Sequence, residues 1–312
     1  MTAAARPEPG AAQRPRVVEL AAGVYAYLQL PGGWCVSNAG IVVGDDGALV
    51  VDTLATERRA RGLRAAVDEL CPGGFRLIVN THHHGDHTFG NHLFGAAATV
   101  IAHELARTEM AETGLALTGL WPEVDWGDVR VTLPTLTFRD RLTARVGGHT
   151  VELLHVGPAH TTNDVVVWLP EARVLFAGDV VLAGATPFTL MGSISGSIAA
   201  LRRLRELDAT AVVCGHGAVT GPEVYDETLD YLLWVRELAE EGARAGIAPL
   251  ELARATPLGR FEHLLDSERL VANLHRAYAE LAGGPLARPL DVLSIFAEMV
   301  EFNAGRVPTC WA

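Results

Sequence analysis

Four imidazoles and one carboxylate lie within six consecutive positions of the segment THHHGDHTFG, residues 81–90. A tag or a solvated polar run would explain such a cluster near a terminus, but this cluster is internal. It follows the apolar run FRLIVN at 75–80, which is typical of a buried strand, and precedes a segment in which a short helix can start. This order of elements places the cluster at the mouth of a rigid scaffold, where side chains are well positioned for chemistry.

The spacing within the cluster separates its members into two pairs. In an extended chain successive side chains point to opposite faces, so His82 and His84 share a face while His83 points away. A glycine then permits a sharp turn, after which Asp86 and His87 can face a second point in space. The spacing predicts two sets of metal ligands, with His83 outside both.

Further histidine and aspartate residues occupy the ends of other predicted strands. His160 lies in the turn GPAHTTND, Asp179 ends VLFAGD, His216 ends AVVCGHG and Asp52 ends LVVDT. Each residue alone is more often a hydrogen-bonded loop residue than a ligand. Four such ends together with the 82–87 cluster predict a single site at which several strands converge.

The elements that must position this site follow from the hydrophobic pattern. Alternating apolar segments over 17–51 predict antiparallel strands, and residues 55–70 predict a helix with four arginines on its outer face. These are Arg58, Arg59, Arg61 and Arg64. Residues 114–129 lack periodicity and predict a loop. Strands are expected across 130–178, followed by the helix SIAALRRLREL and the strand AVVCGHG.

Strands followed by a helix thus occur twice, which predicts an α+β fold with two sheets packed face to face and helices outside. We expect a disordered tail at 1–16, a catalytic domain at 17–221 and a helical extension at 222–312. The tail has no apolar core of a signal peptide, which favours a cytoplasmic location. The apolar window 174–191 contains an aspartate, glycines and a proline, which argues against a membrane span.

Charge and cysteine content narrow the function classes. The chain of 312 residues has a net charge of −12, which disfavours a nucleic-acid partner because phosphate binding needs clustered cations. Its four cysteines are scattered without a CxxC pair and are interpreted as reduced thiols. No membrane or nucleic-acid partner is expected.

The motifs resemble those of the metallo-β-lactamase superfamily. HHHGDH matches its HxHxDH signature, and GPAHTTND, FAGDVV and CGHG match its later motifs in order over about 17–220. The resemblance implies a four-layer αββα sandwich, followed here by the helical extension. It also implies two divalent metal ions bound by seven residues, with Asp52 as a carboxylate that orients neighbouring ligands. The first ion would be bound by His82, His84 and His160, the second by Asp86, His87 and His216, with Asp179 bridging both.

This ligand set implies hydrolytic chemistry. Two adjacent divalent ions lower the pKa of a shared water to about 7, and Asp86 is then the catalytic residue that accepts its proton. Imidazole and carboxylate ligands favour zinc, although iron or manganese can fill the same site. An aspartate at the bridging position resembles the pattern of the thioesterase-like members. The β-lactamases of the superfamily have cysteine or serine at that position.

Apolar residues are expected to form the substrate pocket, namely Trp34, Trp121, Trp126, Phe188 and Met191. Each tryptophan could equally pin its own loop. The segments TPFTLMGSISGS and FNAGRVPTC resemble the second-ring cyclases and thioesterases of aromatic polyketide pathways, such as the actinorhodin one. The implied substrate is a poly-β-ketone thioester on an acyl carrier protein, which would undergo aldol cyclisation, dehydration and thioester cleavage.

Two alternatives remain open at this point. The first is a general thioesterase or lactonase acting on a small acyl substrate. The second is a metal-binding interaction module without catalysis. A carrier protein would dock on the basic helix face of Arg202, Arg203 and Arg205, and the helical extension offers a surface for a homodimer.

Overall fold

The computed structural model describes residues 14–45, 47–95 and 98–312. The expected tail at 1–16 falls largely outside the described residues. Within this part of the chain the first sheet has the strand order β1-β2-β3-β4-β5-β6-β7. Its strands are β1 (Arg16–Ala21), β2 (Val24–Leu28), β3 (Ala39–Val42), β4 (Ala48–Val51), β5 (Phe75–Val79), β6 (Thr99–His103) and β7 (Leu136–Phe138).

The second sheet has the order β13-β12-β11-β10-β9-β8 among the described residues. Its strands are β8 (Arg141–Val146), β9 (His149–His155), β10 (Val165–Leu169), β11 (Val174–Leu182), β12 (Ala211–His216) and β13 (Val219–Thr220). β11 and β12 run parallel, and their neighbours pair antiparallel. In the first sheet β1 to β4 form the predicted antiparallel meander, and β4 to β7 run parallel.

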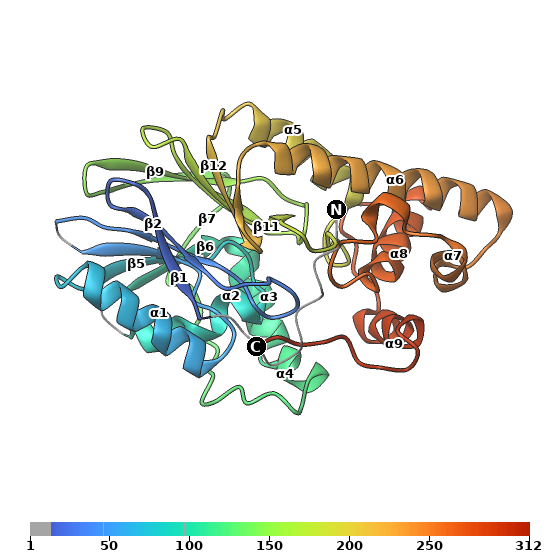
Figure 1. The fold of residues 1–312 in the computed structure, drawn as a ribbon, viewed down its shortest axis with the longest axis horizontal. Coiled ribbons are helices and arrows are strands. Elements are labelled where there is room, and N and C mark those ends of the chain that lie inside the picture. The colour runs from blue at the N-terminus through green and yellow to red at the C-terminus, as the bar shows by residue number, and fades with distance from the viewer. Residues whose placement is uncertain (1–13, 46, 96–97) are drawn as a thin grey trace, which may run out of the picture.

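Helices cover the outer faces of both sheets (Figure 1). α1 lies against the first sheet, whereas α5 and α6 lie against the second. The described helices are α1 (Glu57–Leu70), α2 (Gly85–Thr88), the 3-10 helix η1 (Phe89–Phe94), α3 (Glu104–Thr113), α4 (Ala116–Leu120), α5 (Ile194–Arg205), α6 (Glu223–Ala245), α7 (Pro249–Ala255), the 3-10 helix η2 (Gly259–Phe261), α8 (Arg269–Leu281) and α9 (Val292–Phe302).

The layer order follows from the alternation of strand side chains, as β4 illustrates. Leu49 and Val51 point between the sheets and join a core with Val167 and Phe176 of the second sheet. Their neighbours in β4, Ala48 and Val50, point outward and pack beneath α1. A strand buried on both faces reads as a continuous apolar run, which is the sequence ALVV. The predicted four-layer αββα sandwich is therefore confirmed.

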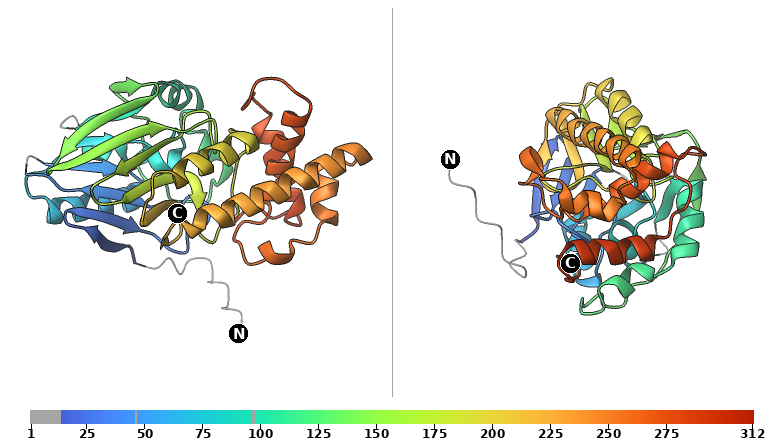
Figure 2. Two further views of the ribbon diagram at one scale, coloured as in Figure 1. Left: turned by 90° about the horizontal axis from the view of Figure 1, so that it is seen from above. Right: turned by 90° about the vertical axis from the view of Figure 1, so that its right-hand side faces the viewer.

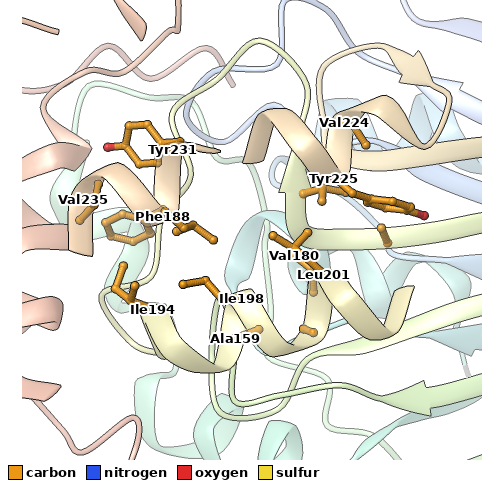
Figure 3. Close-up of a cluster of buried hydrophobic side chains, with 14 of the residues drawn as sticks. Ala159, Val180, Phe188, Ile194, Ile198, Leu201, Val224, Tyr225, Tyr231 and Val235 are labelled. Atoms are coloured by element: carbon orange, nitrogen blue, oxygen red, sulfur yellow. The ribbon is translucent and has the colours of Figure 1, made fainter. Parts of the chain in front are cut away.

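The helical extension lies at one end of the sandwich (Figure 2). Its helix α6 continues the outer layer beside α5, so that Val224, Tyr225 and Tyr231 pack with Ile198 and Leu201 (Figure 3). The extension therefore shares a hydrophobic core with the second sheet.

Three local predictions were wrong. Residues 130–135 form no strand, since Pro134 lacks the N–H that a ladder needs, and the short β7 that follows joins the first sheet. The predicted loop at 114–129 contains the short helix α4. Arg59 does not lie on the outer face of α1, because its buried guanidinium donates to Gln29 Oε1 and to the carbonyl of Trp311 at 2.6 Å each.

No described helix combines the length and apolar character that crossing a membrane requires. The apolar window 174–191 forms β11 and the loop after it.

Candidate metal centre

Five chain segments converge at one edge of the two sheets. Asp52 follows β4, the histidine cluster follows β5, and His160 lies in the turn between β9 and β10. Asp179 belongs to β11, and His216 is the last residue of β12. Asp179 does not end its strand as predicted, because β11 continues to Leu182. The structure nevertheless brings all seven predicted metal ligands into this one site.

The first ligand cluster consists of three imidazoles. His84 Nδ1 lies 3.0 Å from His82 Nε2 and 2.9 Å from His160 Nε2. The three ligand nitrogens lie within 4.8 Å of one another, which is compatible with a single bound ion. All three predicted ligands of the first metal therefore meet.

The second ligand cluster combines a carboxylate with two imidazoles. Asp86 Oδ2 lies 3.3 Å from His216 Nε2 and 3.9 Å from His87 Nε2. One ligand atom from each of these three residues lies within 4.8 Å of the other two. The predicted ligands of the second metal therefore form a separate group beside the first.

Asp179 lies between the two clusters. One carboxylate oxygen is 3.1 Å from His87 Nε2, and the other is 3.4 Å from both His160 Nε2 and His216 Nε2. Space for this carboxylate depends on Gly215, because a Cβ there would clash with Asp179 Oδ1. The glycine of the motif CGHG thus has a steric role beside the histidine.

The outer nitrogens of the ligand rings are held by hydrogen bonds that determine which inner nitrogens carry lone pairs. His160 Nδ1 donates to the carbonyl of Phe188 at 2.5 Å, and His216 Nδ1 donates to that of Gly33 at 3.1 Å. When each ring is neutral, the Nε2 atom is therefore the one that carries the lone pair, and it faces the carboxylate of Asp179. Such a set of acceptors fits a cation.

Asp52 orients ligands of both clusters. Its Oδ2 accepts from His87 Nδ1 at 2.8 Å and from the Thr81 hydroxyl at 2.8 Å, and that hydroxyl in turn accepts from His82 Nδ1 at 3.0 Å. The inner Nε2 atoms of His82 and His87 are left to face the centre. Within the described residues, His87 Nε2 and Asp179 Oδ1 have no hydrogen-bond partner, as expected of atoms arranged for a metal.

The electrostatics of the clusters differ. Burial, together with the neighbouring imidazoles, holds the pKa of His82 and of His84 well below the ordinary value. Burial also opposes protonation of His216, but Asp179 and Asp86 outweigh it and raise the pKa of His216 to about 9. Burial likewise opposes protonation of His87, but Asp179, Asp52 and Asp86 outweigh it and hold the pKa of His87 well above its ordinary value. The carboxylates thus create a field that favours positive charge at the second cluster.

His83 lies outside both clusters, as the spacing predicted. Its ring accepts a hydrogen bond from Asn163 Nδ2 at 3.0 Å and lies 3.3 Å from a carboxylate oxygen of Glu109. His82 and His83 form bends and not a strand, and His84 is the N-cap of α2, so the strand expected there is absent although the separation of the side chains was predicted correctly.

A cavity of about 70 Å³ opens beside the ligands, and Asp86, Asp179 and His216 contribute to its wall. Four of the five predicted pocket residues line it, namely Trp34, Trp121, Phe188 and Met191. Trp126 is absent from the described lining; it is buried beside Phe89 and donates to the carbonyl of Trp121 at 3.1 Å. It supports the pocket from behind.

Part of the cavity lining was not predicted from the sequence. These residues come from α4, α8 and α9: Leu117, Leu120, Arg269, Val292 and Phe296. The apolar faces of these helices could have indicated that they pack against the domain. No pattern in the nearby sequence indicates that they lie close to Trp34.

Comparisons with known proteins agree with this arrangement. The sequence profile of the family described as "Metallo-beta-lactamase superfamily" matches residues 32–216. A linear primary-alkylsulfatase from a Pseudomonas species is 32% identical over 136 residues, which cover 40% of this chain and 26% of that protein. A hydroxyacylglutathione hydrolase from Methylococcus capsulatus is 32% identical over 167 residues, covering 50% of this chain and 57% of that protein. The chain thus spans less than two thirds of either relative.

A solved structure with a similar fold is the metallo-beta-lactamase from Pontibacter korlensis. It has a TM-score of 0.57 and 23% identity, and the match covers 70% of this chain and 99% of that one. The family match spans more than half of the 312 residues and contains all seven clustered ligands. The chain therefore belongs to the metallo-beta-lactamase superfamily.

Proposed function

We propose that this protein is a binuclear metal-dependent hydrolase that cleaves a thioester with an apolar acyl group. The observation that supports it is the pair of ligand clusters joined by Asp179 at the wall of an apolar cavity. Two divalent ions held there would supply Lewis acidity and acidify a water molecule at neutral pH. Zinc is the proposed metal because imidazole and carboxylate donors suit it, with iron and manganese as alternatives.

The chain's own residues have separable roles in this reaction. Asp86 lies at the cavity wall with its carboxylate beside His216, so it is placed to accept the proton of an attacking water. Trp34 and Phe188 exclude water from the space beside the ligands and contact the apolar part of the substrate. Asp52 keeps His87 in the tautomer that faces the centre.

The choice of a thioester rests on the bridging aspartate and on one relative. The hydroxyacylglutathione hydrolase is named for hydrolysing an acylated glutathione, which is a thioester. The cavity of about 70 Å³ is small compared with the roughly 300–1,000 Å³ of typical ligand pockets. It accommodates the reacting end of a small acyl group more readily than a multi-ring polyketide, so we rank the general thioesterase above the polyketide cyclase.

An acyl carrier protein as the source of the thioester is a further part of the proposal. Its docking helix, α5, is less available than expected, because Arg203 donates to the carbonyl of His155 and Arg205 pairs with Asp226. Within the described residues Arg202 has no such contact and is exposed. A free thioester is therefore the better first substrate to test.

The test combines metal analysis with a substrate panel. Protein purified without chelator should contain about two metal ions per chain and hydrolyse acetyl, octanoyl or benzoyl thioesters of coenzyme A in preference to a lactone, a cephalosporin and a primary alkyl sulfate. A chelator should abolish turnover, and added zinc should restore it.

Three results would count against the proposal. Hydrolysis without bound metal would refute the metal centre. Two bound metals without turnover of any ester would favour an interaction module. Preferred cleavage of the alkyl sulfate would keep the metal centre but replace the thioester.

A further inference from the structure

The side chain of Trp34 is held by residues from the helical extension. Its indole Nε1 donates to Glu268 Oε1 at 2.7 Å, although the two residues are 234 positions apart. The guanidinium of Arg269 lies over the indole ring, with Cζ 4.0 Å from the ring centroid. The single donor and the aromatic surface of this cavity residue are thus both engaged by consecutive residues at the start of α8.

These two residues are themselves rigidly placed. The Arg269 side chain is only 3% exposed, pairs with Asp266 at 2.9 Å, and donates to the carbonyl of Thr186 at 2.9 Å. Burial raises the pKa of Asp266 to about 6, although Arg269 lowers it. Glu268 is buried as well. A buried ion pair with fixed partners orders the guanidinium in a way that an exposed one would not.

The same extension also fixes the aromatic residue opposite Trp34. The Phe188 ring lies 5.1 Å from the Trp34 ring in an edge-on arrangement and beside Tyr231 and Val235 of α6 (Figure 3). Its loop is tied to α8, because Asn273 accepts from the backbone N–H of Thr189 at 2.9 Å and donates to the carbonyl of Pro187 at 2.7 Å. Both aromatic walls therefore depend on residues beyond the sheets.

We propose that Glu268 and Arg269 are positioning residues that hold Trp34 as a fixed wall of the cavity, and that the helical extension thereby determines which acyl groups reach the metal centre. This inference rests on the proposed function for its choice of substrates. A planar or bulky apolar group touches the wall and depends on its position, whereas an acetyl group is too small to do so.

The first test measures selectivity. Glu268→Ala should raise the KM for a benzoyl thioester about tenfold, leave kcat near that of the wild type, and leave acetyl thioester turnover and metal content unchanged. Arg269→Met should raise the same KM, because it removes the cation from the Trp34 ring. Glu268→Gln keeps an acceptor oxygen and should retain the wild-type preference. Arg254→Met, which breaks the exposed Arg254–Glu301 pair of the same extension, is the matched control and should change nothing.

Protein stability is controlled in the same experiment. Arg269→Met leaves Asp266 without its ion-pair partner, so its thermal melting is measured alongside. Glu268→Ala tests the contact without touching that pair, and it removes no helix cap, because the Glu268 side chain makes no capping hydrogen bond. An unchanged benzoyl-to-acetyl preference in a folded Glu268→Ala variant would overturn the proposal.

The second test is independent of turnover. Binding of benzoate, followed by the change in tryptophan fluorescence, should weaken about tenfold in Glu268→Ala and stay unchanged in Arg254→Met. If the wild type binds benzoate in this way but hydrolyses no thioester, the proposed function fails and the positioning role stands. Equal benzoate affinity in the wild type and Glu268→Ala, or no binding to the wild type, would overturn the positioning role.

Discussion

The two ligand clusters lie side by side but differ in charge. The first consists of three imidazoles, and the pKa of His82 and of His84 lies well below the ordinary value because of burial and neighbouring rings. The second contains Asp86, and there the carboxylates outweigh burial and raise the pKa of His216 to about 9. In the metal-free protein His82 and His84 thus offer neutral donors at neutral pH, whereas His216 holds a proton where a cation would sit. Similar spacing in sequence does not imply equivalent metal sites.

The largest expected effect comes from the residue that the clusters share. Asp179→Asn removes the carboxylate that contacts His87, His160 and His216 and offsets the repulsion between two adjacent cations. We expect the affinity for both metals to fall about a hundredfold or more, and turnover to fall with it. Elemental analysis and titration with zinc would measure this, and loss at only one cluster would show that Asp179 is not shared.

A smaller loss of metal should distinguish a ligand of the first cluster, His84, from its neighbour His83. His84→Ala removes the ring that contacts both His82 and His160, so metal content should fall to about one ion per chain. His83→Ala should retain both ions but lower the melting temperature, because it leaves a cavity and removes one hydrogen bond of the buried Asn163 amide. Equal metal loss in the two variants would contradict the separation of His83 from the ligands.

The smallest effect concerns protons released when zinc binds. His216, with its pKa of about 9, carries a proton at pH 7.5 in the metal-free protein and must lose it to bind a metal, and the carboxylates shift the pKa of His87 in the same direction. Calorimetric titration in buffers of different ionisation enthalpy should show more proton release for His84→Ala, which keeps the second cluster, than for His216→Ala, which keeps the first. Equal release would mean that the clusters do not differ in charge.

Much of the site could be predicted from sequence because its signals are local. His82, His84, Asp86 and His87 lie within six consecutive residues, so their spacing is visible in the sequence. The remaining ligands lie in or beside strands whose sequences are apolar runs. The four layers followed from strand and helix periodicity. The exclusion of His83 was predicted as well, although His82 and His83 lie in bends and not in the expected strand.

The sequence by itself thus determined the family, the layers and which histidines could be ligands, since each depends on spacing along the chain. Only the tertiary structure decided that β7 joins the first sheet, that Trp126 lies behind the cavity and not in it, and that Arg59 is buried. Only it brought Glu268 onto Trp34. Contacts between residues so distant in sequence arise from the packing of whole helices and strands. The local sequence pattern around either residue therefore does not identify the residue that it contacts.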